Sequence, residues 1–393
     1  MQYRIIGLGI TPWRGAWMNR QHLLSRLAAD KPAMYSNGPL YVWDIRSGKF
    51  PLRAGGIARE NHVLIDLCPS FVPRWPRLPK YDDLAMAFHS RRWLRLLGSD
   101  QLPLVAIVFD PGFYPFLRHL NPEVSVYHAY DLFEGMPGWS AGLENLEDAL
   151  LRCADIRTAS SEVTCQRLGQ RSGRHVTWLP NGVEVGLFEE VAGNNQPEPA
   201  DIAAIPRPRL GWIGSLHTGL DFRLVAKLAR ARPNYHFVFV GPGPAYLSDA
   251  ASTDYRALTS YPNVHFLPSR SRREAVQSMF AMDVNLMLYK IEDDSWTKAG
   301  QPLKLFEYLA VGRPIISTPM PAVLPYADSE LVAIATDATD WLRAMDSAIS
   351  GEPTDVSRRR KQVAAGNDWN VRAQRLDDLI CEALGARTNS ATP

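Results

Sequence analysis

Short apolar runs alternate with amphipathic stretches through the first half of the chain. The apolar runs predict strands at residues 4–10, 33–36, 40–43, 63–67, 104–109, 124–128 and 157–160. Stretches with apolar side chains three and four residues apart predict helices at 19–29, 82–97, 143–153 and 162–170. Strands and helices that alternate at this spacing are typical of a doubly wound parallel sheet.

The second half repeats the pattern after a polar stretch. Residues 189–208 are rich in proline, alanine, asparagine and acidic side chains and lack apolar periodicity, which predicts a linker. Beyond it we expect strands at 209–213, 236–240, 264–267, 284–288 and 315–317, and helices at 221–231 and 272–281. The chain is therefore predicted to be α/β, with two Rossmann-like doubly wound domains, residues 1–188 and 206–368, facing each other across a cleft.

Residues 302–318 carry the strongest pattern in the chain, a short helix that runs directly into a buried strand. Pro302 suits the first helical position, and Gly312 suits the left-handed residue that follows a last turn. One face is apolar and should pack on a sheet. Lys304 and Glu307 share another face near the open start of the helix.

This helix start has the chemistry of a nucleotide site. An amine and free backbone N–H groups favour a phosphate, and a carboxylate accepts hydrogen bonds from a ribose diol. The combination of Lys304 and Glu307 suggests a nucleotide-diphosphate ligand. The alternative is an amphipathic helix whose Lys–Glu pair is simply solvated.

With these residues the chain resembles nucleotide-sugar-dependent glycosyltransferases of the two-Rossmann-domain (GT-B) architecture. The likeness is to the bacterial polysaccharide-building group (GT4-like), with features similar to xanthan-type glucuronosyltransferases, and includes the turn at 180–183. It implies that Glu307 binds the donor ribose. It also implies that a terminal helix, residues 369–386, crosses back to the first domain.

Strand ends and the resemblance together give a predicted donor site. Gly214 and Gly241 each end a strand, where the absence of a side chain leaves room for a ligand. The full set is Gly214, Ser215, His217, Gly241, Pro242, Leu267, Tyr289, Gln301, Leu303, Lys304 and Glu307. The loop after 209–213 lacks the Arg and Lys of many relatives, which places more of the phosphate charge on Lys304. Ala299 stands where retaining members carry a Glu, so either the sugar is held differently or the reaction inverts.

In the first domain, Asp131 follows a strand end and resembles the general base of inverting relatives, which takes the proton of the acceptor hydroxyl. The alternative is a helix N-cap, and Asp110 is a weaker candidate in a similar position. On the acceptor side we expect Trp13, Trp17 and Asn19, whose aromatic members either stack on a sugar or pack in the core.

The amino-acid composition limits which kinds of partner and which compartment we expect for this protein. Lys and Arg total 43 against 41 Asp and Glu, so no charge excess favours a nucleic acid. Four scattered cysteines and the lack of an 18-residue apolar run indicate a reduced cytoplasmic protein, either soluble or peripheral at the inner face of the membrane. We expect no cofactor and no metal; the acidic run at 292–294 is the metal-binding alternative. The basic helix around Arg91 and Arg95 either touches anionic lipid or is an ordinary surface helix.

The sequence thus predicts a glycosyltransferase of hexosyltransferase type. It would move a sugar from a nucleotide-diphosphate donor, with UDP favoured, to a saccharide acceptor such as a polyprenyl-linked intermediate of a bacterial surface or exported polysaccharide. A sugar-nucleotide epimerase of the same architecture and a catalytically silent nucleotide-binding scaffold remain alternatives. An NAD-dependent oxidoreductase is disfavoured, because Gly7 and Gly241 do not start a complete Gly-x-Gly-x-x-Gly pattern.

Overall fold

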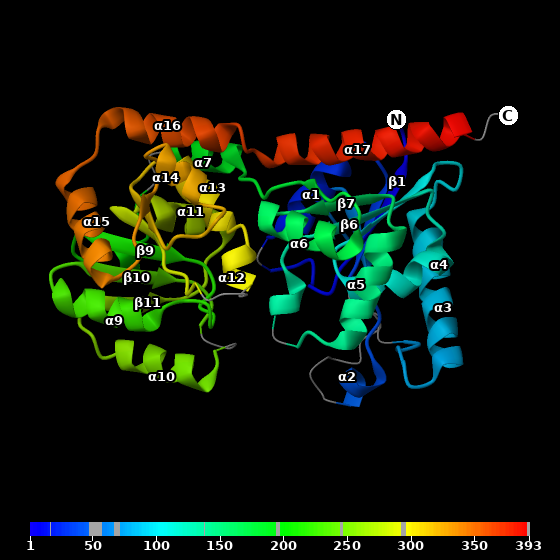
Figure 1. Ribbon diagram of the computed structural model, residues 1–393, viewed down its shortest axis with the longest axis horizontal. Coiled ribbons are helices and arrows are strands. Elements are labelled where there is room, and N and C mark those ends of the chain that lie inside the picture. The colour runs from blue at the N-terminus through cyan, green and yellow to red at the C-terminus, as the bar shows by residue number, and fades with distance from the viewer. Residues whose placement is uncertain are drawn as a thin grey trace. The chain divides into compact units, whose positions relative to one another are not determined.

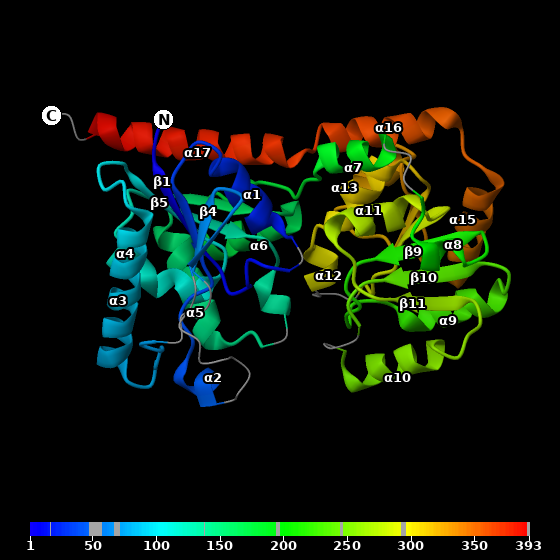
Figure 2. The ribbon, with the colours of Figure 1, turned by 180° about the vertical axis from the view of Figure 1, so that it is seen from behind.

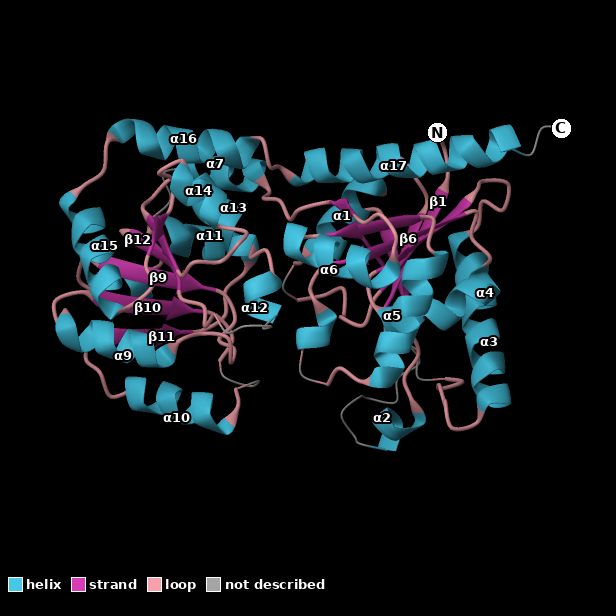
Figure 3. Cartoon of the chain, in the orientation of Figure 1, coloured by secondary structure: helices cyan, strands magenta, loops and turns pink. Residues whose placement is uncertain are grey.

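The computed structural model describes the chain except residues 16, 47–56, 67–70, 137, 194–196, 244–246, 292–295 and 391–393. It separates into two compact units: the N-terminal unit, Met1–Pro180 with Trp369–Pro393, and the C-terminal unit, Asn181–Asp368. In each unit helices surround a sheet (Figure 3).

The N-terminal unit has an eight-stranded sheet in the order β3-β4-β2-β1-β5-β6-β7-β8. All neighbouring pairs are parallel except β3 and β4. The strands are β1 (Arg4–Leu8), β2 (Ala33–Ser36), β3 (Ile57–Glu60), β4 (Val63–Asp66), β5 (Leu104–Val108), β6 (Val124–Ala129), β7 (Ile156–Ala159) and β8 (Thr177–Trp178). The α-helices are α1 (Asn19–Leu27), α2 (Val42–Arg46), α3 (Pro79–Leu97), α4 (Leu117–Leu120), α5 (Ala141–Cys153), α6 (Glu162–Ser172) and α17 (Trp369–Ser390).

The C-terminal unit has a six-stranded parallel sheet in the order β11-β10-β9-β12-β13-β14. The strands are β9 (Arg209–Ile213), β10 (His236–Val240), β11 (Val264–Leu267), β12 (Val284–Met287), β13 (Ile315–Ser317) and β14 (Ala333–Ile334). The helices are α7 (Val185–Gly193), α8 (Ala200–Ala203), α9 (Phe222–Ala231), α10 (Asp249–Leu258), α11 (Arg272–Phe280), α12 (Trp296–Ala299), α13 (Leu303–Val311), α14 (Leu324–Asp328), α15 (Ala338–Ser350) and α16 (Thr354–Ala365).

Both sheets reverse their strand order in the middle. β1 lies between β2 and β5, and β9 lies between β10 and β12. Figure 1 shows β9, β10 and β11 side by side in that order. In open α/β sheets, ligands bind beyond the carboxyl ends of the strands at such a reversal. The loops after β1, β5 and β6 in one unit, and after β9, β10 and β12 in the other, are therefore the places to examine for a site.

The last helix, α17, is grouped with the N-terminal unit and lies beside α1 in both ribbon views (Figures 1 and 2). The imidazole of His22 stacks on the ring of Trp369 with centroids 4.8 Å apart. The hydroxyl of Tyr3 donates to Asp377 Oδ1 at 2.5 Å. Aromatic packing and a polar contact thus hold this helix against α1 and β1.

Residues 40–43 do not form the predicted strand. Tyr41 makes an isolated bridge to Arg74, and α2 begins at Val42. The carboxylate of Asp44 accepts the backbone N–H of Tyr41 at 3.1 Å, a local bond that competes with strand pairing. The edge strand β3 was not predicted, because its side chains are largely exposed and lack an apolar run.

The prediction of a linker over 189–208 is wrong. α7 and α8 lie in this region, and Phe188, Val191 and Ile202 are buried in the core of the C-terminal unit. Because these apolar side chains attach the segment to that core, the chain changes unit between Pro180 and Asn181, whereas the sequence placed the end of the first domain at residue 188. Among the described residues, no helix combines the length and apolar character that crossing a bilayer requires.

Candidate functional site

Helix α13 is fixed on the sheet of the C-terminal unit by both apolar and polar contacts. Phe306 and Leu309 are buried in the core, and the hydroxyl of Tyr308 accepts the backbone N–H of Ile213 at 3.1 Å. Gly312, with φ 80°, ends the helix in the predicted left-handed conformation. Pro302 occupies the position before the first helical residue, one place earlier than predicted. The helix start therefore lies at the carboxyl end of β9.

Lys304 and Glu307 lie one turn apart in the first two turns of this helix. Neither makes a hydrogen bond or ion pair with another described residue, whereas the Nζ of Lys304 lies 4.3 Å from the centroid of the Trp212 ring. Burial lowers the pKa of Lys304 to about 8, and Glu307 opposes that shift. Burial also raises the pKa of Glu307, against the influence of Lys304 and Arg272. An ammonium and a carboxylate one helical turn apart are thus available to a ligand.

Gly214 and Gly241, at the ends of β9 and β10, each allow a close approach that a side chain would block. A Cβ at Gly214 would lie 2.4 Å from Lys304 Nζ, and the φ of Gly214 is 143°. A Cβ at Gly241 would lie 2.2 Å from the carbonyl oxygen of Gly214, because the loops after β9 and β10 touch. The sequence predicted that these glycines make room for a ligand. In the structure, each makes room for another part of the protein.

The Trp212 ring, which lies next to the Lys304 ammonium, contacts two further aromatic side chains. Trp212 makes T-shaped contacts with His217 and Tyr289, with ring centroids 6.0 Å and 5.0 Å away. Burial, aided by Lys304, lowers the pKa of His217 to about 4, so that this imidazole is neutral near pH 7. Ser215 is exposed, and its carbonyl oxygen accepts the indole N–H of Trp212 at 3.4 Å. His217 therefore adds no positive charge, and Lys304 supplies the cation at this edge.

Other residues of the predicted donor site serve the local fold. The side-chain oxygen of Gln301 accepts the backbone N–H of Asn181, and the amide of Asn181 donates to the Gln301 carbonyl, both at 2.7 Å. The carbonyls of Leu267 and Pro242 accept the backbone N–H groups of Gly241 and Leu216. Leu303, the first residue of α13, is partly buried. The sequence identified the turn at Asn181 only by resemblance. In the structure, Asn181 is hydrogen-bonded to Gln301 in the loop before α13.

In the N-terminal unit, Asp131 follows the end of β6. Its Oδ1 is buried and has no hydrogen-bond partner among the described residues. Burial raises the pKa of Asp131 to about 7, and a backbone hydrogen bond from Leu132 opposes the shift. The short 3-10 helix that follows, Phe133–Gly135, has Leu132 before it and no side-chain cap. The N-cap interpretation of Asp131 is therefore wrong.

Asp110 has the helix-capping role that was the alternative for Asp131. Its carboxylate accepts the N–H of Gly112 at 2.8 Å and caps the 3-10 helix Pro111–Phe116. Burial raises the pKa of Asp110 to about 6. A carboxylate occupied by a cap is less available to an acceptor hydroxyl than one with an unpartnered oxygen.

Most of the residues predicted to face the acceptor are buried in the N-terminal unit. Trp13 is 1% exposed and packs on Tyr35 with centroids 5.2 Å apart, so its ring does not present a face for a sugar. Asn19 is also buried, and its side-chain oxygen accepts the backbone N–H of Arg20 at 2.8 Å. Trp17 is partly buried, with its ring 5.1 Å from that of His22. Of the three, only Trp17 retains some exposure.

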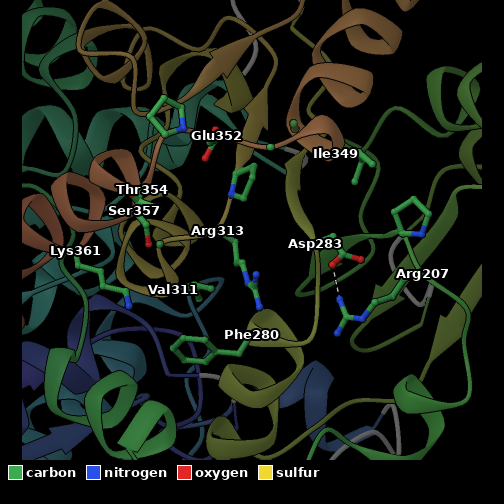
Figure 4. A pocket seen from close by; sticks show the side chains of 16 residues that line it. Arg207, Phe280, Asp283, Val311, Arg313, Ile349, Glu352, Thr354, Ser357 and Lys361 are labelled. Carbon is green, nitrogen blue, oxygen red and sulfur yellow. Dashed lines mark hydrogen bonds and ion pairs between the residues drawn. The ribbon is translucent and has the colours of Figure 1, made fainter.

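A large cavity lies at the opposite edge of the C-terminal sheet. It has a volume of about 730 Å³, and Figure 4 shows Arg207, Asp283 and Arg313 among its lining residues. These residues flank the amino ends of β9, β12 and β13. Arg207 and Asp283 form an ion pair with each other. The cavity is therefore separate from the strand ends that carry Lys304.

The described part of the chain contains no cluster of three or more His, Cys, Asp or Glu side chains arranged to hold a metal. The acidic run at 292–294, which was the metal-binding alternative, lies outside the described residues.

Comparison with known proteins agrees with the geometry of the C-terminal unit. Residues 207–350 match the family described as Glycosyl transferases group 1. The C-terminal unit thus contains a group 1 glycosyltransferase domain. The match includes the strand-end glycines, Trp212 and the whole of α13, and it confirms the prediction of a glycosyltransferase.

A relative in Bacillus subtilis extends the similarity beyond this domain. The chain is 28% identical over 285 residues to a protein described as a putative teichuronic acid biosynthesis glycosyltransferase, TuaH. The aligned region covers 66% of this chain and 67% of that protein.

Solved structures share the fold over nearly the whole chain. Sucrose-phosphate synthase from Thermosynechococcus elongatus has a TM-score of 0.69 at 15% identity, covering 98% of this chain and 100% of that one. Anabaena Alr3699/HepE, solved in complex with UDP-glucose, has a TM-score of 0.66 at 13% identity, covering 96% and 99%. These likenesses confirm the predicted GT-B architecture.

Proposed function

We propose that this glycosyltransferase moves a sugar from a UDP-linked donor to a saccharide acceptor during assembly of a bacterial surface or exported polysaccharide. The observation that carries the proposal is the ammonium of Lys304 at the start of α13, which forms no ion pair with a described residue, with the carboxylate of Glu307 one turn further. A diphosphate satisfies the first group and a ribose diol the second. The UDP-glucose bound to Anabaena HepE and the polysaccharide named for the Bacillus relative support the donor and the process.

In the proposed reaction Asp131 is the general base. The acceptor oxygen bonds to the anomeric carbon as the bond from that carbon to the diphosphate oxygen breaks. The hydroxyl proton passes to the Asp131 carboxylate, and the bonding electron pair leaves with the diphosphate. The charge that develops on the leaving diphosphate is stabilised by Lys304 and the backbone N–H groups of the helix start. A base acting directly on the acceptor favours inversion at the anomeric carbon, in keeping with Ala299 at the position where a retaining relative would carry a Glu.

We place the acceptor on a membrane lipid and the protein at the inner membrane face. Leu84 and Phe88 are 68% and 44% exposed on α3, and Arg91 and Arg95 continue the same exposed stripe. Two apolar side chains followed by two cations suit an interface with anionic lipid. The free thiols of Cys153, Cys165 and Cys381 fit a reducing compartment.

The reaction is tested by incubating the protein with radiolabelled UDP-sugars, with and without a bacterial lipid extract. Labelled lipid that forms only with the extract supports transfer. Conversion of the UDP-sugar without an acceptor supports the epimerase, and nucleotide binding without turnover supports the silent scaffold. Absence of UDP binding in calorimetry contradicts the proposal.

The membrane contact is tested by sedimentation with vesicles. Phosphatidylglycerol vesicles should retain the protein and phosphatidylcholine vesicles should not, since the stripe is cationic. The double substitution Leu84→Ser and Phe88→Ser should release it. Val371→Ser is the control, because Val371 on α17 is 47% exposed, close to the 44% of Phe88. Equal retention of the double variant contradicts this surface.

A further inference from the structure

The amine at the donor site is held in place by an aromatic ring. The Nζ of Lys304 lies 4.3 Å from the centroid of the Trp212 ring, and no other contact of that ammonium with a described side chain approaches a hydrogen bond or ion pair. Among aromatic side chains, the indole face attracts a cation most strongly. The ring contact therefore decides where this flexible side chain rests before a ligand arrives.

Trp212 is a rigid support for that contact. Its side chain is fully buried within β9, a strand paired on both sides, by β10 and β12. The indole N–H donates to the Ser215 carbonyl at 3.4 Å, and the ring makes T-shaped contacts with His217 and Tyr289. Full burial and these three contacts hold the ring in the position that it has beside the ammonium.

Gly214 completes the arrangement. The Cβ that any other residue would carry there lies 2.4 Å from Lys304 Nζ and 2.7 Å from Cε, so the amine can occupy its position over the ring only because residue 214 is glycine. Trp212 thus provides an aromatic face for the cation, and Gly214 leaves the space that the amine needs to reach that face.

An aromatic partner has a different consequence from a carboxylate. A carboxylate would neutralise the ammonium, and its ion pair would have to break before a phosphate could bind. The π face attracts the cation and leaves its charge and N–H donors available on the open side. Fixing a long side chain in advance also reduces the ordering cost of ligand binding.

We propose that Trp212 is a positioning residue for donor binding, one that holds the Lys304 ammonium ready for the diphosphate. The inference rests on the proposed function, since it concerns the same nucleotide site. It gives the buried tryptophan of β9 a role in phosphate recognition without direct contact with the nucleotide.

Calorimetry with two probes, UDP and uridine, tests this role. Trp212→Leu should weaken UDP binding about three- to tenfold, the range of a partly desolvated cation–π contact, and leave uridine binding unchanged. Trp212→Phe, which keeps an aromatic face, should recover part of the loss. In a Lys304→Ala background, Trp212→Leu should have no further effect on UDP, because the partner of the ring is gone.

The matched control is Trp341→Leu, which removes another fully buried tryptophan of the same unit, on α15. It should leave the ratio of UDP to uridine affinity unchanged. The inference is overturned if Trp212→Leu weakens UDP and uridine alike, or weakens UDP equally with Lys304 absent. If the unsubstituted protein binds no UDP, the proposed function fails instead, and the two failures remain distinguishable.

Discussion

Asp131 in the N-terminal unit and Lys304 in the C-terminal unit both lie at the carboxyl edge of a sheet, and burial shifts their pKa values in opposite directions. In the N-terminal unit, the pKa of Asp131 rises to about 7. In the C-terminal unit, the pKa of Lys304 falls to about 8. Both shifts have desolvation as their largest cause, because a low dielectric disfavours whichever form is charged.

The difference lies in what surrounds each group. Asp131 has a backbone N–H nearby and one oxygen without a partner, so that near pH 7 it takes up or releases a proton readily. The carboxylate of Glu307 opposes the fall in the pKa of Lys304, which stays at about 8, so the amine is mainly protonated at the same pH. One environment suits a base and the other a fixed cation. The following predictions test this division, from the largest expected effect to the smallest.

Asp131→Asn should reduce transfer by about 10²- to 10⁴-fold, the usual contribution of a general base. UDP affinity, measured by calorimetry, should not change, because the donor groups lie in the other unit. Asp110→Asn is the control and should retain far more activity, since Asp110 serves as a helix cap. Activity near that of the unsubstituted protein in Asp131→Asn would remove Asp131 from the reaction.

Gly214→Ala should weaken UDP binding by roughly tenfold, because the new methyl group would displace the Lys304 amine and would be strained at a φ of 143°. Gly186→Ala is the matched control in the same unit, where a Cβ would meet nothing within 4 Å. UDP titrations of both variants measure the effect. Unchanged affinity in Gly214→Ala would show that the amine has another productive position.

UDP affinity should fall as the pH rises past about 8, since the phosphate selects the protonated form of Lys304 and burial sets the pKa of that amine near this value. Lys304→Arg, which stays charged at every accessible pH, should bind UDP with little dependence on pH in this range. Calorimetry between pH 6.5 and 9.5 gives the comparison. Parallel profiles for the two proteins would assign the titration to another group.

Asp131→Asn should also stabilise the protein slightly at pH 8. A carboxyl whose pKa is raised in the folded state favours folding at low pH, and that contribution is lost as the pH rises through 7. Replacing the charged form with a neutral amide should raise the free energy of unfolding at pH 8 by on the order of 1 kcal/mol. Thermal melting at pH 5 and pH 8 would reveal it, and a lower melting temperature at pH 8 would contradict it.

The sequence predicted α13 well because its signals are local. Pro302, Gly312 and the spacing of Lys304 and Glu307 can be recognised within one short segment, and the structure places them as a helix start and end. The parallel strands were predictable for the same reason, since each is a short apolar run. Residues 40–43 and the edge strand β3 were not, because their conformation depends on a single capping bond and on pairing with β4.

The environment of each candidate residue could not be predicted locally. Trp212 appears in the sequence as one more apolar residue of a strand, and its contact with Lys304 joins residues that are far apart in the chain. Trp13 looked like a residue at the rim of a site, yet it is buried against Tyr35. The burial of Asp131 Oδ1, which has no partner among the described residues, likewise could not be recognised from its neighbours in the sequence.

The paired hydrogen bonds between Asn181 and Gln301 connect two places that the chain order keeps apart. Asn181 is the first residue of the C-terminal unit, and Gln301 directly precedes the turn into α13. The segment by which the chain enters this unit is thus hydrogen-bonded to the residue just before the helix that bears Lys304. Because these bonds link the two segments, a substitution that displaces Asn181 is expected to shift the residues that lead into the helix.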